Sequence, residues 1–281
     1  MINRWMEFVR FSHTVFALPF ALASMFVAAE GLPSWNVVIW ILVAMMTARN
    51  AAMGFNRYID RDIDAKNPRT ERRHLVSGEI STKSALVFII VNIIIFVFSA
   101  WMLNPLAFTL SVPTVLVLMS YSLWKRFSWL CHFFLGIAIG LSPAGAWVAV
   151  RGDLDWYPVV LGLVLAFWIA GFDMIYATQD QEVDQDLELH SIPSRFGTQG
   201  ALRFAAASHI LMLISLIVLS YMRSWSLYSF LELGLIGGIL LYIHKLRKSN
   251  SLDDMNKDFF LANAGISVIM MVSLISETFL N

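Results

Sequence analysis

The sequence predicts an all-α integral membrane protein with about nine transmembrane helices in one bundle. Hydrophobic residues make up 58% of the 281 residues and charged residues 14%, whereas a soluble domain carries about a quarter charged residues. The mean hydropathy is +0.67, and apolar segments of about 20 residues, the length that crosses a bilayer, recur along the chain. This composition excludes a soluble enzyme and a disordered chain. The net charge of zero gives no general electrostatic reason for nucleic-acid binding.

Nine apolar segments of this length follow one another. We expect membrane-spanning helices at about 11–29, 36–55, 84–103, 105–123, 129–149, 157–178, 202–221, 226–244 and 259–279. The first segment lacks a small-residue cleavage site, so we interpret it as a retained span and not as a signal peptide. Pro19, Pro113 and Pro143 fall inside spans, where neighbouring helices can satisfy the carbonyls that proline leaves free.

The distribution of basic residues predicts the orientation. With the N-terminus in the cytoplasm, 17 of the 20 Lys and Arg residues lie on the cytoplasmic side, and only Arg151 and Arg223 lie outside. Arg49 falls within the second span. By the positive-inside rule this asymmetry predicts a cytoplasmic N-terminus. It also supports nine spans, because one missed span would scramble the alternation.

Two cytoplasmic connections are much longer than the rest, at about 57–83 and 179–201. Long loops in a compact fold are usually functional or disordered, and these two contain most of the unusual polar residues. We therefore interpret them as cap loops of a single membrane domain that comprises residues 1–281. Glycine-rich stretches, at 136–140 and 234–238, are expected to mark close helix packing and not phosphate-binding loops.

A row of polar side chains begins where the second span ends. Asn56, Asp60 and Asp64 are four residues apart, so on a continuing helix they lie along one face. A solvated hairpin is the ordinary interpretation of a single acidic loop of this kind. Glu232, in the eighth span, is a further acid within an apolar segment and has no obvious partner in the sequence.

A second row follows the sixth span and changes that interpretation. Asp180 and Asp184 are again four residues apart, and Asp173, seven residues before Asp180, shares their face. Like charges at this spacing destabilise a helix unless something neutralises them, and a carboxylate at membrane depth is costly. Two such rows on the same side of the membrane favour a functional site.

The two rows suit Mg²⁺, which takes oxygen ligands and is often held by a few carboxylates together with substrate phosphates. No His or Cys cluster has the spacing of a zinc site. Cations beside metal-binding carboxylates suit a diphosphate, because Arg and Lys bind the phosphate oxygens that the metal leaves free. The basic residues near the rows are Arg57, Arg61, Lys66, Arg69, Arg72, Arg73, Lys125 and Arg126.

These residues resemble the motifs of the UbiA superfamily of intramembrane prenyltransferases. The first motif of that family is an Asn followed by Asp at four-residue spacing, as in Asn56, Asp60 and Asp64. The family often has Asp directly after the Asn, where this chain has Arg57. This departure leaves the row intact and bears on how many metal ions bind.

The second family motif resembles Asp173-x-x-Tyr176-Ala177-x-x-Asp180-x-x-x-Asp184, which is complete here. The segments 190–193 and 196–197, and Tyr121 with Lys125-Arg126, also match, so the resemblance covers essentially the whole chain. Within the superfamily, segments 10–20 and 56–70 are similar to the 4-hydroxybenzoate polyprenyltransferase group. That group includes relatives assigned to a menaquinone route with a dihydroxynaphthoate-type acceptor, and the sequence does not separate the two.

The resemblance implies Mg²⁺-dependent transfer of a polyprenyl group from polyprenyl diphosphate to a small aromatic acid in quinone biosynthesis. The metal and basic groups stabilise the departing diphosphate, and shielding from water protects the allylic cation. 4-Hydroxybenzoate is the first candidate acceptor, and a dihydroxynaphthoate is the alternative. The expected location is the cytoplasmic (inner) membrane among its lipids, with the active site facing the cytoplasm and without an obligate protein partner or nucleic acid.

The expected roles follow from these motifs. The metal ligands are expected to be Asn56, Asp60, Asp64, Asp180 and Asp184. The diphosphate and the acceptor are expected to be bound by Asn50, Arg69, Tyr121, Lys125 and Arg126.

Three further residues are candidate catalytic groups. Asp173 lies deeper than Asp180, so it is a candidate to orient the acceptor or to accept its proton. Tyr176, one turn further on, could hydrogen-bond the reacting groups. Arg49 is an intramembrane arginine that needs a partner, which is either the carboxylate of the acceptor or Asp173.

A cation-coupled membrane transporter is the alternative from another functional class. Such a protein would also bury carboxylates near Arg49, but at the bilayer midplane and on broken helices. Here the acids lie at the cytoplasmic ends of spans and continue into loops. This position favours the enzyme.

Overall fold

The structure is a computed structural model that describes residues 2–10, 14–246 and 252–280. All regular secondary structure in these residues is helical, which confirms the predicted all-α class. Eight of the described helices are long and apolar enough to cross a membrane. They are α3 (Trp35–Ile59), α5 (Thr82–Leu103), α6 (Pro105–Ser120) continued by η2 (Tyr121–Arg126), α7 (Cys131–Arg151), α8 (Trp156–Ala177), α10 (Ile192–Met222), α11 (Leu227–Leu246) and α12 (Leu252–Leu280).

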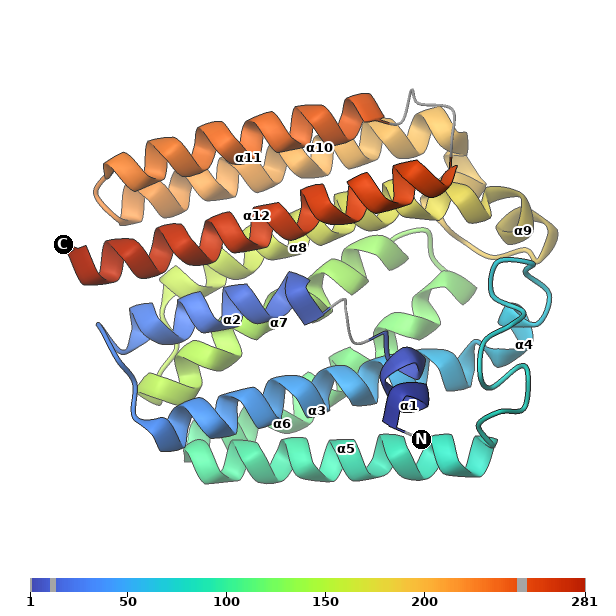
Figure 1. The fold of residues 1–281 in the computed structure, drawn as a ribbon, viewed down its shortest axis with the longest axis horizontal. Helices are drawn as coiled ribbons and strands as arrows, with labels where there is room; N and C mark the ends of the chain where they lie inside the picture. Colours follow the sequence, from blue (N-terminus) through green and yellow to red (C-terminus); the bar gives the residue numbers. More distant parts are fainter. Residues whose placement is uncertain (1, 11–13, 247–251, 281) are drawn as a thin grey trace.

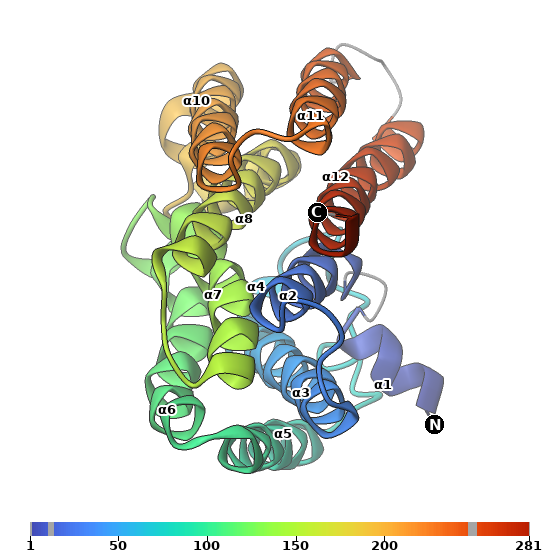
Figure 2. The ribbon, with the colours of Figure 1, turned by 90° about the vertical axis from the view of Figure 1, so that its left-hand side faces the viewer.

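The helix at the first predicted span is shorter than these eight. α2 (Thr14–Ala28) has 15 residues, and residues 11–13, where the predicted span begins, lie outside the described residues. α2 nevertheless lies within the bundle between α7 and α12, as Figure 2 shows. Phe20 and Ala21 of α2 are completely buried. α2 is therefore a core helix of the bundle, preceded by the short α1 (Ile2–Phe8).

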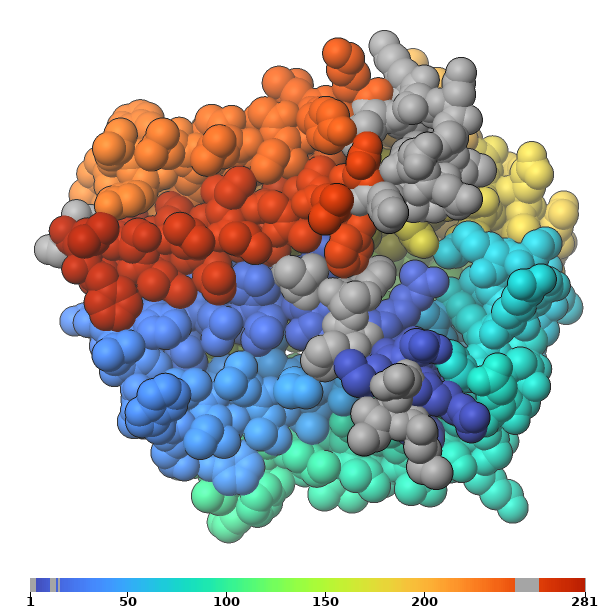
Figure 3. Space-filling model, viewed as in Figure 1, coloured from blue at the N-terminus to red at the C-terminus, as the bar shows by residue number. Residues whose placement is uncertain are grey.

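The long helices run alongside one another in an elongated bundle (Figure 1). Figure 2 looks along them and shows α3, α5 and α6 on one side, α8, α10, α11 and α12 on the other, and α2 and α7 between. On the face drawn in Figure 3, the red α12 and the blue α2 meet directly. The main core lies where α2, α8 and α12 meet: the buried ring of Trp168 stacks on Phe20, and its Nε1 donates to Asn263 at 2.8 Å.

Local signals in the sequence set several helix ends. The Asn104 side chain accepts a backbone N–H in the first turn of α6, which Pro105 begins. Ser191 and Ser194 form a reciprocal capping box at the start of α10. Gly152 ends α7 with a left-handed φ of 72°, a conformation that favours glycine.

The second long connection is mostly helical, and the predicted loop at 179–201 is wrong in this respect. η3 (Thr178–Asp180) and α9 (Gln181–Asp186) continue from α8, and α10 already begins at Ile192 because of its capping box. Gly197 (φ 67°) interrupts the helical geometry inside α10. In the first connection, α4 (Arg61–Asp64) follows α3 directly, and turns and bends continue to residue 80.

Close packing between α7 and α8 depends on glycine. A Cβ atom at Gly136 would overlap the carbonyl oxygen of Ala166, and a Cβ atom at Gly140 would lie 2.7 Å from the carbonyl oxygen of Gly162. This confirms the packing role expected for residues 136–140. The same expectation for 234–238 is wrong, because no described atom lies within 4 Å of a Cβ atom at any of those glycines.

Glu232 has partners that sequence spacing did not reveal. Arg223, just after α10, lies 2.6 Å from Glu232 of α11 and 2.8 Å from Glu277 of α12. The Ser273 hydroxyl donates to Glu232 at 3.2 Å. All three charged side chains are more than nine-tenths buried. Arg223 therefore joins α10, α11 and α12 at the end of the bundle away from α4 and α9.

Replacing Gly136 by alanine is expected to destabilise the protein by about 1–3 kcal/mol, because a Cβ has no space against α8. Gly145→Ala is the matched control: it lies on the same helix, and no described atom lies within 4 Å of its Cβ position. Thermal unfolding in detergent measures both variants. Equal midpoints for the two variants would contradict this packing.

Arg223→Ala is expected to cost about 3–5 kcal/mol, because it leaves two buried carboxylates without their cation. Arg151→Ala is the control, since the Arg151 side chain is 39% exposed and its acidic partners are more exposed still; its expected cost is below about 1 kcal/mol. Chemical unfolding in detergent micelles compares the two. A small loss in the Arg223 variant would mean that the buried ion pairs do not hold these helices together.

Candidate active site

The predicted site residues gather at one end of the bundle, where α4 and α9 lie next to each other in Figure 1. α3 ends at Ile59, and Asp60 leaves the helical conformation before α4 begins. The backbone N–H groups of Asp60 and Asp64 still donate to the carbonyls of Asn56 and Asp60, at 3.0 and 2.8 Å. The four-residue spacing of the first row therefore continues across the break. The Asn56 amide also donates to Asp60 Oδ2 at 3.0 Å and to Ser122 at 3.3 Å.

Asp60 is the most buried acid of this end, with 1% of its surface exposed. Lys125 Nζ lies 2.7 Å from one carboxylate oxygen, and Arg126 lies 3.2 Å from the other. Burial raises the pKa of Asp60, and the positive charges of Lys125 and Arg126 oppose that shift. The structure thus brings together residues of the predicted metal set and of the predicted diphosphate set as direct ion pairs.

The first connection supplies the partners of the other acids. Arg73 lies 2.6 Å from Asp64. Arg69 binds Asp180 through two nitrogens, one of them at 2.8 Å, and the Asn67 amide donates to the same carboxylate at 2.9 Å. These contacts join the first connection to the second row of acids.

Tyr176 lies beside the Arg69–Asp180 pair. Its hydroxyl is 3.3 Å from Arg69 Nη1, and the guanidinium lies 5.3 Å from the centre of its ring. Asn50 and Tyr121 are half-buried on α3 and η2. In the part of the chain that the structure describes, the Asn50 side chain forms no hydrogen bond.

The residues just before α10 contact both Asp184 of α9 and Lys125 of η2. The Ser191 hydroxyl donates to Asp184 Oδ2 at 2.7 Å. The backbone N–H of His190 donates to the carbonyl of Lys125 at 2.7 Å. The second connection is therefore fixed to both η2 and the second row.

Arg49 and Asp173 do not pair, so that alternative for Arg49 is wrong. Asp173 instead lies 2.7 Å from His132 Nδ1. Arg49 Nη2 donates to the carbonyls of Val9 and Arg10, which follow α1. Its buried Nη1 finds no acceptor among the described residues.

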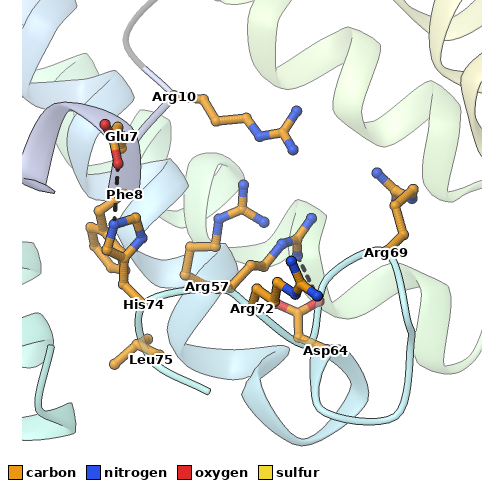
Figure 4. A pocket seen from close by; sticks show the side chains of 10 residues that line it. Glu7, Phe8, Arg10, Arg57, Asp64, Arg69, Arg72, His74 and Leu75 are labelled. Carbon is orange, nitrogen blue, oxygen red and sulfur yellow. Dashed lines mark hydrogen bonds and ion pairs between the residues drawn. The ribbon is translucent and has the colours of Figure 1, made fainter. Parts of the chain in front are cut away.

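A pocket of about 220 Å³ lies beside Asp64. Figure 4 shows arginine side chains that reach one space from α3, from the chain after α1 and from the first connection. Five arginines line it against two acids, so it carries an excess of positive charge. The lining residues are Glu7, Phe8, Arg10, Arg57, Asp64, Arg69, Arg72, Arg73, His74 and Leu75.

Sequence reasoning missed His132 and Asn67 and gave no role to Arg10. His132 could have been noticed as an ionisable residue within an apolar span, which is a functional candidate by default. Asn67 could have been noticed only inside the family-like segment 56–70. Residues 11–13 of the other family-like segment lie outside the described residues.

The five predicted metal ligands do not form a preformed metal cluster. Among the described residues, no group of three or more His, Cys, Asp or Glu side chains is placed to hold a metal ion. Three of the acids are paired with Lys or Arg, and Asp184 is paired with Ser191. The donors are nevertheless all oxygen atoms of the kind that Mg²⁺ prefers, so the residues present fit this ion chemically.

A model of the UbiA prenyltransferase family matches residues 17–264. The 4-hydroxybenzoate octaprenyltransferase of Haemophilus ducreyi is 30% identical over 275 residues, which cover 96% of this chain and 99% of the relative. The enzyme of the same name from Vibrio campbellii is 33% identical over 172 residues. That match covers 61% of this chain and 60% of the relative.

Solved structures agree with this relationship. The apo structure of a UbiA homolog from Aeropyrum pernix superposes with a TM-score of 0.84 at 28% identity, over 94% of this chain and 98% of that one. A UbiA homolog from Archaeoglobus fulgidus, bound to GPP and Mg²⁺, has a TM-score of 0.75 at 19% identity over 97% and 99% of the chains, a likeness of fold. The chain therefore belongs to the UbiA prenyltransferase family and is an integral membrane enzyme, which contradicts the alternative of a cation-coupled transporter.

Proposed function

We propose that this enzyme transfers a polyprenyl group from polyprenyl diphosphate to an aromatic acid, with 4-hydroxybenzoate as the acceptor. The observation that carries the proposal is the arginine-rich pocket beside two rows of neutralised acids, at the end of an apolar bundle. The names of the relatives from H. ducreyi and V. campbellii support the acceptor. We also propose that residues 1–281 form one domain in the cytoplasmic membrane and that the site faces the cytoplasm, where most Lys and Arg residues of the sequence are expected.

The pocket suits a diphosphate because its positive charge is incompletely balanced. Arg69 and Arg73 are paired with Asp180 and Asp64. No ion pair of the described residues involves the other lining arginines, which are Arg10, Arg57 and Arg72. Planar guanidinium groups bind phosphate oxygens through paired hydrogen bonds.

Mg²⁺ would be held by Asn56, Asp60, Asp64, Asp180 and Asp184, whose oxygen donors suit it. When bound, the ion stabilises the negative charge of the leaving diphosphate. These acids already need positive charge beside them, since most of them are neutralised by a Lys or Arg side chain. The A. fulgidus homolog, described with GPP and Mg²⁺, supports this choice of ion.

The helices and side chains around the acids serve cleavage of the diphosphate, protection of the cation and binding of the acceptor. The bond between the allylic carbon and the diphosphate oxygen breaks, and the electron pair leaves with the diphosphate. The apolar helices accommodate the prenyl chain and exclude water from the allylic cation. Buried Arg49, with Nη1 free of described partners, binds the carboxylate of the acceptor, and Asn50 and Tyr121 lie on neighbouring parts of α3 and η2.

Asp60→Ala and Asp180→Ala are expected to lower kcat by about 100-fold or more, because a bound metal contributes several kcal/mol of charge stabilisation. The full chain in detergent is incubated with Mg²⁺, radiolabelled polyprenyl diphosphate and each candidate aromatic acid. Asp62→Ala is the matched control, since Asp62 lies between Asp60 and Asp64 of the first row but its side chain is 82% exposed.

Removal of Mg²⁺ by EDTA should abolish the wild-type product, and magnesium should restore it. The proposal fails if the wild type forms no prenylated aromatic with any acceptor. It also fails if the two variants form product as fast as the wild type. Product from a dihydroxynaphthoate and none from 4-hydroxybenzoate would contradict the proposed acceptor but not the reaction.

Arg72→Gln is expected to raise KM for polyprenyl diphosphate about tenfold, since a hydrogen bond to a charged group contributes about 1.5–3 kcal/mol. Arg61→Gln is the control, because Arg61 is outside the pocket and pairs with the exposed Asp62. Initial rates at varied concentrations of each substrate separate the two KM values. A rise in KM for the aromatic acid alone would contradict a diphosphate role for this pocket.

A further inference from the structure

His132 is a buried ionisable group that the proposed function leaves without a task. It lies in the first turn of α7 and is 3% exposed. Its Nδ1 is 2.7 Å from Asp173 Oδ2, on the facing helix α8. The Asp173 side chain is 30% exposed, whereas the His132 side chain beside it is 3% exposed.

Both ring nitrogens of His132 have hydrogen-bond partners. The backbone N–H of Ile192 donates to His132 Nε2 at 3.3 Å. A backbone N–H can only donate, so Nε2 accepts this hydrogen bond and Nδ1 is the nitrogen that faces Asp173 as donor. His132 is therefore held at both ring nitrogens, by the backbone of Ile192 on one side and by Asp173 on the other.

This partner distinguishes Asp173 from most acids of the two rows. Asp60, Asp64 and Asp180 are each paired with Lys or Arg. A fixed positive charge favours the ionised form of a carboxylate and weakens it as a base. The described side-chain partner of Asp173 is instead the ring of His132. Asp173 Oδ1 has no hydrogen-bond partner among the described residues, so it is free to accept a proton.

His132 is also linked to the other acids through three consecutive residues. His190 donates its backbone N–H to the carbonyl of Lys125, and Ser191 donates its hydroxyl to Asp184. Ile192 donates to His132. The segment 190–192 therefore fixes the orientation of His132 together with that of groups on both sides of the site.

We propose that His132 is a positioning residue that holds Asp173 so that Asp173 Oδ1 accepts the proton lost by the aromatic ring. The bond to diphosphate breaks and its electron pair leaves on the diphosphate, and the ring carbon then attacks the allylic cation to form the new bond. The ring proton then passes to Asp173, and the electron pair of the C–H bond restores the aromatic ring. This inference rests on the proposed function.

His132→Phe tests the role, because phenylalanine keeps the ring but removes both hydrogen bonds. We expect kcat to fall at least tenfold with little change in KM for polyprenyl diphosphate. We also expect a larger kinetic isotope effect than in the wild type when the acceptor carries deuterium on the ring carbons beside its hydroxyl, because proton removal becomes slower. A purely structural role for His132 would not change the isotope effect.

Two further variants keep the test independent of folding. His132→Asn retains a donor at the position of Nδ1 and is expected to recover most of kcat. Asp173→Asn removes the base, and adding His132→Phe to it should slow the enzyme no further. His190→Ala is the control, because the exposed His190 contributes its backbone and not its ring.

The outcomes separate this inference from the function on which it rests. If the wild type forms no prenylated aromatic, the proposed function fails. If the wild type is active and His132→Phe has the same kcat and isotope effect, the role of His132 is refuted. Additive losses in the double variant would equally refute it, because the two residues would then act separately.

Discussion

Carboxylates at the end of an apolar helix bundle have to be balanced by charge or by hydrogen bonds, since burying them unpaired costs several kcal/mol. This requirement organises the end of the molecule at which α4 and α9 meet. The first connection supplies Arg69 and Arg73 to Asp180 and Asp64, and η2 supplies Lys125 to Asp60. Ion pairs with these acids therefore hold the first connection and η2 in place, although the acids belong to parts of the chain that are far apart in the sequence.

The bundle itself makes a second kind of contact possible. α7 and α8 approach so closely at Gly136 that a methyl group would not fit against α8. One turn from that glycine, the short side chains of His132 and Asp173 meet directly between the same two helices. The close approach of α7 and α8 at Gly136 therefore helps to bring His132 and Asp173 within hydrogen-bond distance.

The sequence predicted the helices and the two acidic rows because hydropathy and four-residue spacing are local properties. It did not predict the partners of the buried charges, because pairs such as Arg223 with Glu277 join residues far apart along the chain. Arg49 is the clearest case: Asp173 was one of its two expected partners, yet Arg49 holds two backbone carbonyls after α1. The later part of the loop expected at 179–201 is helical because α10 begins at the capping box of Ser191 and Ser194, a two-residue signal that composition conceals.

The segment 190–192 has a consequence for attempts to alter the enzyme. Its three residues contact Lys125, Asp184 and His132 in order, so inserting or deleting one residue here would misalign all three contacts together. Libraries that aim at new acceptors should therefore keep the length of this segment constant. Variation is better directed to residues that face the site from a single helix, where one change affects one contact.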